Sequence, residues 1–384
     1  MDAVWPLAKV RRVSERGNRL YRGLDRYVGV PLVVSVGRFR RRRTPPTRPA
    51  RIVVLKTGAI GDTILLSGPL RDLRAAFPES RVVLVTSTSN AEAGRLLDDA
   101  DEVVSTPISR PWLAIRRIRA ERADLLLDFA SWPRIDALVS AFAGTPYTIG
   151  FATSGQHRHH AYDAVVEHSD TRHELDNYRA LIVAAGARAA SSPYVAPPGV
   201  LARSRIPESP FVVLHLWAAG IQKERKEWSL DRWRGLASEL TRRGFTIALT
   251  GGLADVERSR AFLADGPPLG PSIDFTGTLS LPELVDLLGH SSGLVTVNTG
   301  VMHLAAAAGV PTVALNGPTS SRRWGPIGPR CVSVDSETPG CGYLNLGFEY
   351  AGRPSDCMEG VSVARVLEAT LDLVDEEKGV PRSA

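Results

Sequence analysis

One stretch of this chain, residues 293–315, limits the possible folds more than any other. It opens with an apolar run over 293–297 that has the length and composition of a buried parallel strand. The turn residues Asn-Thr-Gly follow at 298–300, and a short Ala-rich helix is predicted over 301–308. A second strand is predicted over 312–315, directly after a glycine and a proline. Such a strand–turn–helix–strand unit is typical of a parallel sheet with helices on its faces.

The helix predicted over 301–308 begins at the carboxyl end of a strand. Its first N–H groups and its dipole favour a negatively charged group there, and ligands of open α/β sheets bind at this edge. We therefore expect a phosphate-bearing ligand at Asn298, Thr299 and Gly300. His303 lies one turn into the helix and could donate to a phosphate or sugar oxygen, or be a core histidine bonded to a backbone carbonyl.

From residue 50 onward, strands alternate with helices, which predicts doubly wound α/β domains. Strands are predicted over 51–56, 82–86, 102–104, 125–128, 211–215 and 245–250, and helices over 62–77, 91–97, 112–119, 134–142, 174–186, 228–242, 255–263, 281–289 and 361–374. The Pro- and Ser-rich stretch 190–210 has no clear period and is typical of a linker. We divide the chain into an N-terminal extension (1–49), an N-terminal domain (50–189), the linker (190–210), a C-terminal domain (211–360), and a terminal helix and tail (361–384).

The net charge of +6 is concentrated in the extension. Residues 1–50 carry 13 Lys and Arg against 3 Asp and Glu, whereas the other 334 residues carry 34 against 38. A protein that coats nucleic acid would spread such charge over a folded face, so no nucleic-acid partner is expected. No stretch approaches 18 uncharged apolar residues, so no transmembrane helix is expected either. Residues 20–43 alternate apolar and basic character, which suits attachment to the inner membrane leaflet or, alternatively, a docking helix with a basic tether.

Three cysteines are present, at 331, 341 and 357. Their odd number and lack of metal-binding spacing argue against a disulfide framework, so a reducing cytosol is the default expectation. Cys341 and Cys357 could still pair or hold a metal.

Five segments of the chain are informative together: RIVVLKTGAIGDTILLSGPLRDLRAAFPES from residue 51, HELDNYRALIVAAG from 173, HLWAAGIQKERKEWSLDRW from 215, LTGG from 249, and NTGVMHLAAAAGVPTVALNGPTSSRRWGP from 298. In this order they resemble glycosyltransferase family 9, the heptosyltransferases of lipopolysaccharide core assembly and their relatives. The resemblance covers roughly residues 50–375. It implies the GT-B fold, in which two Rossmann-like domains face a cleft with the donor mainly on the C-terminal domain. It also implies inverting transfer that needs no metal.

The resemblance assigns two catalytic candidates. Asp62 lies where a strand turns into a helix, and as the family's base it would take the proton of the acceptor hydroxyl. Alternatively, it is an acid that complements the helix dipole. Lys226 occupies the family's lysine position, where a cation would stabilise the departing diphosphate, unless it is a solvated loop charge.

The resemblance and the local sequence also indicate candidate binding residues. Thr57, Gly58 and Gly61 form a loop suited to close approach by the acceptor. Thr250, Gly251 and Gly252 end a strand at the ligand-binding edge, and with Asn298, Thr299, Gly300 and His303 they make up the predicted donor site. Asn298 and Val301 replace the usual Asp and Pro of the family. The lost charge at Asn298 is consistent with a different sugar, weaker binding or lost activity.

The sequence therefore predicts an inverting, metal-independent glycosyltransferase. Its donor would be a nucleotide sugar, with ADP-heptose as the first to test, and its acceptor a glycan, glycolipid or small glycoside. We expect it in the cytoplasm, with peripheral attachment to the inner face of the membrane left open. Two alternatives are a non-catalytic nucleotide-sugar-binding or scaffold protein, and an epimerase-like enzyme that needs no acceptor.

Overall fold

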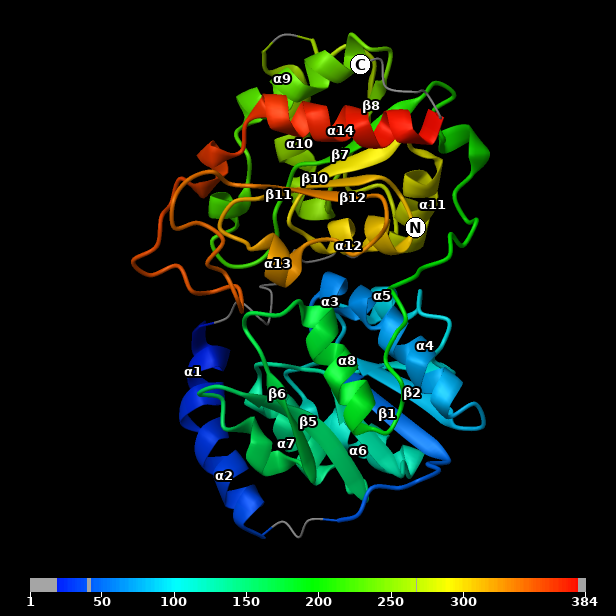
Figure 1. Ribbon diagram of the computed structural model, residues 1–384, viewed down its shortest axis with the longest axis vertical. Helices are drawn as coiled ribbons and strands as arrows, with labels where there is room; N and C mark the ends of the chain where they lie inside the picture. Colours follow the sequence, from blue (N-terminus) through cyan, green and yellow to red (C-terminus); the bar gives the residue numbers. More distant parts are fainter. Residues whose placement is uncertain (1–18, 40–42, 267, 379–384) are drawn as a thin grey trace, which may run out of the picture.

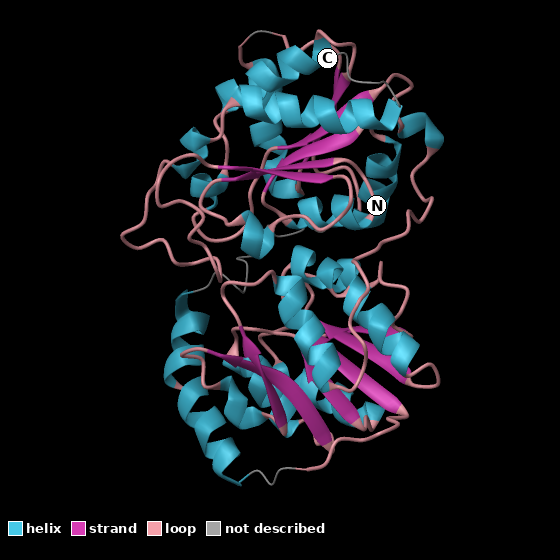
Figure 2. Cartoon of the chain, viewed as in Figure 1, coloured by secondary structure: helices cyan, strands magenta, loops and turns pink. Residues whose placement is uncertain are grey.

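The computed structural model describes residues 19–39, 43–266 and 268–378, which form two lobes (Figure 1). Each lobe is built around one six-stranded, fully parallel sheet. Helices cover both faces of each sheet (Figure 2). The strands are short apolar runs: β1, for example, is buried at every residue after its first, as expected where both faces are covered.

The first lobe holds the N-terminal half of the chain. Its strands are β1 (Arg51–Lys56), β2 (Arg81–Thr86), β3 (Glu102–Ser105), β4 (Leu125–Asp128), β5 (Tyr147–Thr153) and β6 (Ala164–His168), in the order β3-β2-β1-β4-β5-β6. Its helices are α1 (Arg19–Tyr27), α2 (Gly29–Phe39), α3 (Ile60–Leu65), α4 (Ser67–Ala76), α5 (Ala91–Gly94), α6 (Pro111–Glu121), α7 (Arg134–Phe142) and α8 (Glu174–Ala184).

The second lobe repeats this plan. Its strands are β7 (Phe211–His215), β8 (Thr246–Thr250), β9 (Ser272–Asp274), β10 (Gly293–Val297), β11 (Thr312–Asn316) and β12 (Cys331–Asp335), in the order β12-β11-β10-β7-β8-β9. Its helices are α9 (Leu230–Thr241), α10 (Val256–Ala264), α11 (Leu281–His290), α12 (Gly300–Ala307), α13 (Ser321–Trp324) and α14 (Val363–Lys378).

Both sheets have the Rossmann strand order, counted outward from the first strand of each lobe, so the doubly wound α/β prediction is confirmed. The strand order reverses between β1 and β4 in the first lobe and between β7 and β10 in the second. Ligands of such sheets bind outside the carboxyl ends of the strands at these points. The loops after β1 and β10 are therefore the first places to look for a site.

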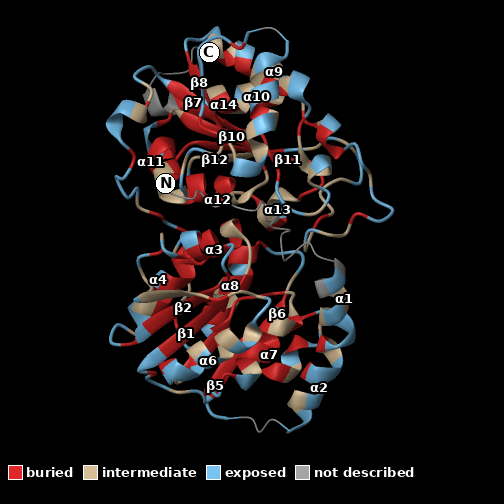
Figure 3. Ribbon diagram, turned by 180° about the vertical axis from the view of Figure 1, so that it is seen from behind, coloured by how far each residue is buried: buried red, intermediate tan, exposed pale blue. Residues whose placement is uncertain are grey.

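The buried core follows the two sheets and continues between the lobes (Figure 3). One cluster of buried apolar side chains includes members of α3, α4 and β1 as well as members of α11 and α12. The segment that connects the lobes joins this cluster through Val195, whose N–H donates to the Ala307 carbonyl at 3.0 Å. The two lobes are thus held together by apolar contact as well as by the chain.

The helix predicted over 62–77 is wrong as a single element. The chain forms α3 and α4 instead, with a break at Leu66. Pro69 explains the break, because it has no N–H to donate to the Leu65 carbonyl, and its ring would clash with that carbonyl in a continuous helix. The break leaves α3 as a short, separate helix at the edge of the sheet.

Four strands, β5, β6, β9 and β12, have no counterpart among the predicted elements. β5 contains Gly150, which packs so closely on Tyr162 that a Cβ would lie 2.3 Å from the ring. β6, β9 and β12 lie at sheet edges, where an uninterrupted apolar run is not needed. The helix predicted over 91–97 is also too long, since α5 ends at Gly94, in close contact with β2 and β3.

The described part of the N-terminal extension forms α1 and α2, which pack against α7 and the 3-10 helix η2 (Arg158–Ala161). Val33 is buried in this contact. The Asp25 carboxylate accepts the N–H groups of Arg134 and Ile135, at 2.8 and 3.0 Å, and pairs with the Arg134 guanidinium at 3.0 Å. This satisfies two N–H groups at the start of α7. The docking-helix prediction thus holds for 19–39, while residues 1–18 and 40–42 lie outside the described structure.

Within the described residues, no helix combines the length and apolar character that crossing a membrane requires.

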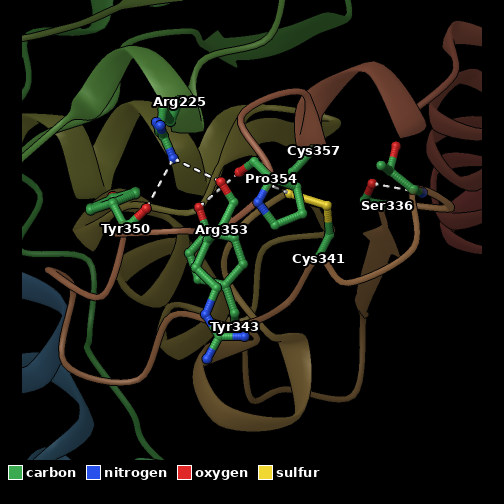
Figure 4. Close-up of a disulfide and its surroundings, with 9 residues drawn as sticks. Arg225, Ser336, Cys341, Tyr343, Tyr350, Arg353, Pro354 and Cys357 are labelled. Atoms are coloured by element: carbon green, nitrogen blue, oxygen red, sulfur yellow. Dashed lines mark hydrogen bonds between the residues drawn. A yellow bond between two sulfur atoms is a disulfide. The ribbon is translucent and has the colours of Figure 1, made fainter.

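A disulfide joins Cys341 to Cys357 (Figure 4), so the argument against disulfides is wrong for these two residues, whose pairing is the alternative that the sequence leaves open. It closes a loop that follows β12 and returns to the 3-10 helix η6 (Cys357–Gly360). Arg225 donates to the carbonyls of Tyr350 and Arg353 in this loop, both at 3.4 Å. The number of cysteines in the sequence does not show which two of them the fold brings together. Cys331 is the free cysteine.

Candidate functional site

Asp62 lies in the first turn of α3, directly after β1. Its carboxylate accepts a hydrogen bond from the Lys56 ammonium at 3.1 Å, and both side chains are largely buried. Lys56 also donates to the Phe129 carbonyl at 3.3 Å and lies 5.1 Å above the Tyr178 ring. This places a fixed carboxylate at the carboxyl edge of the first sheet. Lys56 was not among the predicted site residues, because a lysine at the end of an apolar strand gives no signal of its own.

The turn into α3 is strained. Ala59 has φ 55°, in the left-handed region that a residue with a Cβ seldom adopts. Such strain tends to occur at functional sites, where surrounding contacts hold it in place. Thr63 contributes by donating its hydroxyl to the Ala59 carbonyl at 2.8 Å. The conformation presents the N-terminus of α3 outward from the sheet, toward the second lobe.

The predicted acceptor loop contacts a second buried acid, Asp136. The Thr57 hydroxyl donates to Asp136 at 2.6 Å. Burial, reinforced by the nearby Asp128, raises the pKa of Asp136 to about 7. A carboxyl group whose environment favours the protonated form therefore lies next to the predicted acceptor loop. Neither its burial nor its neighbour could be inferred from the sequence.

The N-termini of α3 and α12 meet where the two lobes touch. A Cβ on Gly300 would lie 2.9 Å from the Ile60 Cβ and 3.0 Å from the Gly61 nitrogen. A Cβ on Gly61 would lie 2.6 Å from Cδ2 of His303. Only glycine at 61 and 300 lets the two helices approach this closely. The structure thus brings together Gly61, Asp62, Gly300 and His303, which are far apart in the sequence.

His303 is buried on α12, and its Nδ1 has no hydrogen-bond partner. Burial lowers the pKa of His303 to about 3, and nearby His173 acts in the same direction. The ring is therefore neutral at physiological pH and able to donate one hydrogen bond and accept another. A buried, unpartnered ring nitrogen at this position is what a ligand would satisfy.

Asn298 and Thr299 form the turn between β10 and α12, with Thr299 as the N-cap residue. The Asn298 amide nitrogen donates to Oδ1 of Asn316 and to the Trp324 carbonyl, both at 3.0 Å. A carboxylate could not donate to that carbonyl, which explains why an amide fits here. Asn298 therefore has a structural role at the edge of the predicted phosphate site.

Thr250 is the last residue of β8, and Gly251 and Gly252 follow it; β7 separates this strand from β10. Thr250 bonds to Nδ1 of buried His215 at 3.0 Å, and burial lowers the pKa of His215 to about 4. The Gly252 N–H donates to the Asp255 carboxylate at 3.0 Å. These residues lie at the same carboxyl edge of the second sheet as the start of α12, but two strands away from it, at the end of β8.

Lys226 lies in the 3-10 helix η4 (Lys223–Lys226), in the loop after β7. Its ammonium donates to the Ala219 carbonyl within the same loop. The loop carries two left-handed residues, Gly220 and Gln222. The hydrogen bond to Ala219 keeps the Lys226 ammonium at its own loop. That Lys226 acts on a diphosphate is still a prediction.

A buried ion pair links the lobes beside this site. Arg323 of α13 donates to the Glu174 carboxylate of α8 at 2.5 Å, and His168 bonds to the same oxygen at 2.9 Å. These contacts hold the pKa of Glu174 well below its usual range, despite its burial. His173 accepts the Leu175 N–H at Nδ1, so its Nε2 carries the proton and donates to the Gly325 carbonyl at 2.9 Å. These long-range contacts were not predicted.

Within the described ranges, no group of three or more His, Cys, Asp or Glu side chains could hold a metal ion. Three histidines, His157, His159 and His160, lie close together around η2, with the rings of neighbouring members tilted at 36° and 38° to each other.

The fold and the facing helix N-termini define a two-lobed α/β protein with a ligand-binding edge on each sheet. A family model described as glycosyltransferase family 9 (heptosyltransferase) matches residues 112–342, and the chain belongs to this family. The predicted membership is thereby confirmed.

Proteins with similar sequences are named as heptosyltransferases. Lipopolysaccharide heptosyltransferase 1 of Salmonella typhimurium is 24% identical over 295 residues, which cover 70% of this chain and 89% of the relative. Lipopolysaccharide heptosyltransferase 1 of Pseudomonas aeruginosa is 36% identical over 135 residues, 35% of this chain and 36% of the relative. The match to the second thus spans about a third of its length.

Solved structures share the fold. The chain is similar to E. coli ADP-heptose lps heptosyltransferase II, with a TM-score of 0.70 and 20% identity over 85% of this chain and 99% of that one. This likeness confirms the predicted GT-B fold. A more distant structure, with a TM-score of 0.53 and 17% identity over 88% of this chain and 80% of that one, is the dodecameric iron-containing heptosyltransferase TibC in complex with ADP-D-beta-D-heptose.

Proposed function

We propose that this protein transfers a heptose from ADP-heptose to an acceptor hydroxyl, with inversion at the anomeric carbon. Membership of glycosyltransferase family 9 and the names of its relatives support this choice of sugar and nucleotide. The observation that carries the proposal is the contact between the N-termini of α3 and α12. Gly61 packs against His303 and Gly300 of the predicted donor site, and Asp62 directly follows Gly61, so its carboxylate lies beside this contact.

Asp62 is the proposed base. In a single displacement, the acceptor oxygen attacks the anomeric carbon while the bond to the diphosphate breaks on the opposite face. The acceptor proton passes to the Asp62 carboxylate, which Lys56 holds in place at 3.1 Å. The alternative role, an acid that complements the helix dipole, does not account for this buried pairing with Lys56.

The departing ADP carries new negative charge on its terminal phosphate. The N–H groups in the first turn of α12, which no side chain caps, and the neutral His303 ring would bind that charge. Lys226 is the proposed cation on the opposite side of the diphosphate. Thr250, Gly251 and Gly252 would then line the nucleotide end of the site.

The acceptor would bind over Thr57, Gly58 and Gly61 on the first lobe. A glycolipid is the first acceptor class to consider, because the relatives are named lipopolysaccharide heptosyltransferases. A cytoplasmic location, with contact to the inner membrane face through residues 20–43, is consistent with such an acceptor and remains a proposal.

The test is release of ADP from ADP-heptose by the purified protein, with and without a panel of glycan and glycoside acceptors. Acceptor-dependent release of ADP and a heptosylated product by mass spectrometry would support the proposal. Donor binding without turnover on every acceptor would favour a non-catalytic binding protein, and product from donor alone would favour an epimerase-like reaction. Repeating the assay with EDTA, and with added Fe²⁺ or Mg²⁺, tests the predicted metal independence.

A further inference from the structure

A cavity of about 380 Å³ lies in the first lobe, where the sheet order reverses between β1 and β4. This volume is in the range of small-molecule sites. The loops after β1 and β4 form its floor, and α1 and α2 of the N-terminal extension cover it. The extension thus completes a site that the Rossmann-like lobe would otherwise leave open.

The wall of the cavity is mainly apolar. Side chains from the loops and α7 contribute Ile108, Trp132, Pro133, Ile135 and Leu138. The extension contributes Leu24, Val28 and Leu32, which lie four residues apart and are 50%, 49% and 46% exposed. Each of these side chains lines the cavity and is also open to solvent. Exposing apolar surface to water costs free energy, which an apolar ligand in the cavity would recover by covering it.

Polar side chains also line the cavity, among them Lys56, Thr57 and Asp136. The Lys56 ammonium lies 3.1 Å from the Asp62 carboxylate, so the cavity reaches the direct partner of the proposed base. An acceptor sugar whose hydroxyl reaches Asp62 would therefore place its next substituent in the apolar part. The cavity thus borders the proposed reaction centre through Lys56.

We propose that this cavity binds an alkyl chain attached directly to the acceptor sugar. The acceptor would then be an amphipathic glycoside, with its apolar group within one sugar of the hydroxyl that is glycosylated. This inference rests on the proposed function, which it deepens by naming the acceptor class. A long polar glycan without such a chain would leave the apolar wall exposed.

Calorimetric binding of hexyl, octyl and decyl β-D-glucoside to the full-length protein, without donor and below micelle formation, tests the proposal. We expect one site, with affinity rising by roughly threefold to fourfold for each methylene until the cavity is filled. Leu32→Trp and Val28→Trp place an indole at two half-exposed lining positions, so both variants should fold. Each should weaken octyl glucoside binding at least tenfold.

Tyr27→Trp is the matched control, because Tyr27 lies on α1, is 76% exposed and does not line the cavity. It should bind as the wild-type protein does. Affinity that does not depend on chain length, or an equal loss in all three variants, would overturn the proposal.

A second readout separates this inference from the proposed transfer activity. Where heptose transfer is observed, Leu32→Trp should raise KM for octyl glucoside and leave KM for methyl glucoside unchanged. Equal KM values in the variant and the wild-type protein would overturn the cavity as an acceptor site while leaving transfer established. Chain-dependent binding without any transfer would refute only the proposed function.

Discussion

Gly61 and His303 are in direct contact across the two lobes, so close that a Cβ on Gly61 would lie 2.6 Å from the imidazole Cδ2. One residue precedes the proposed base, and the other belongs to the proposed phosphate site. Their contact fixes the distance between the two halves of the reaction centre.

Gly61→Ala should therefore force α3 and α12 apart. Overpacking of this kind lowers the free energy of unfolding by about 1–3 kcal/mol, which outweighs the better helix propensity of alanine. We also expect at least a tenfold loss of kcat, because the base would shift relative to the donor. Gly235→Ala in α9 is the control: its nearest neighbours are 3.8 Å away, so it should be neutral or stabilising. Urea unfolding and initial rates measure both effects, and an unchanged Gly61→Ala protein would contradict the contact.

The buried ion pair between Arg323 and Glu174 should be costly to break. Arg323→Met leaves the Glu174 carboxylate buried with only His168 and Asn177 as partners, and we expect a loss of about 3–5 kcal/mol in unfolding free energy. Adding Glu174→Gln should recover part of that loss, since it removes the uncompensated charge. The exposed pair of Arg260 and Glu257 serves as the control, where Arg260→Met should cost less than about 1 kcal/mol.

Asp136 should make stability depend on pH. Its pKa is raised to about 7 in the folded protein from an ordinary value of 3.8, so the folded state binds the proton more tightly than the unfolded chain. The free energy of unfolding contributed by this group therefore falls as pH rises from about 4 to about 7. Asp136→Asn keeps an acceptor for Thr57 and removes the ionisation. The variant should gain stability relative to the wild-type protein between pH 5 and pH 8 in urea unfolding; a constant difference would contradict the shifted pKa.

Asn298→Asp restores the residue type expected from the family resemblance but should destabilise this chain. An ionised carboxylate would face the Trp324 carbonyl, to which the amide now donates, at a cost of about 1–3 kcal/mol. The cost should shrink near pH 3, where a protonated carboxyl can donate. Thermal unfolding of the variant and the wild-type protein at pH 3 and at pH 8 measures this cost. Equal destabilisation at both pH values would contradict the prediction.

Local patterns in the sequence predict much of the fold. The bounds of β4, α7, β7 and β10 agree with the predictions, because each is a continuous apolar run or an amphipathic period bounded by turn residues. The edge strands and the break at Leu66 escape this reasoning, since they depend on neighbouring strands and on one proline.

The site divides in the same way. Asp62 and Gly300 are predictable because each follows a buried strand at the turn into a helix. Lys56 and Asp136 are not, since their roles come from pairing with residues 6 and 79 positions away. The cover that α1 and α2 form over the cavity also depends on tertiary packing, which no local pattern reports.

The most direct test of the account is the kinetics of Asp62→Asn. Loss of the base should lower kcat by about 10²–10⁴-fold while calorimetric binding of ADP stays at the wild-type value. Asp176→Asn, at an exposed position in the first turn of α8, is the matched control for a helix N-terminal acid and should retain wild-type kcat. Wild-type turnover by a folded Asp62→Asn protein would contradict the assignment of Asp62 as the base.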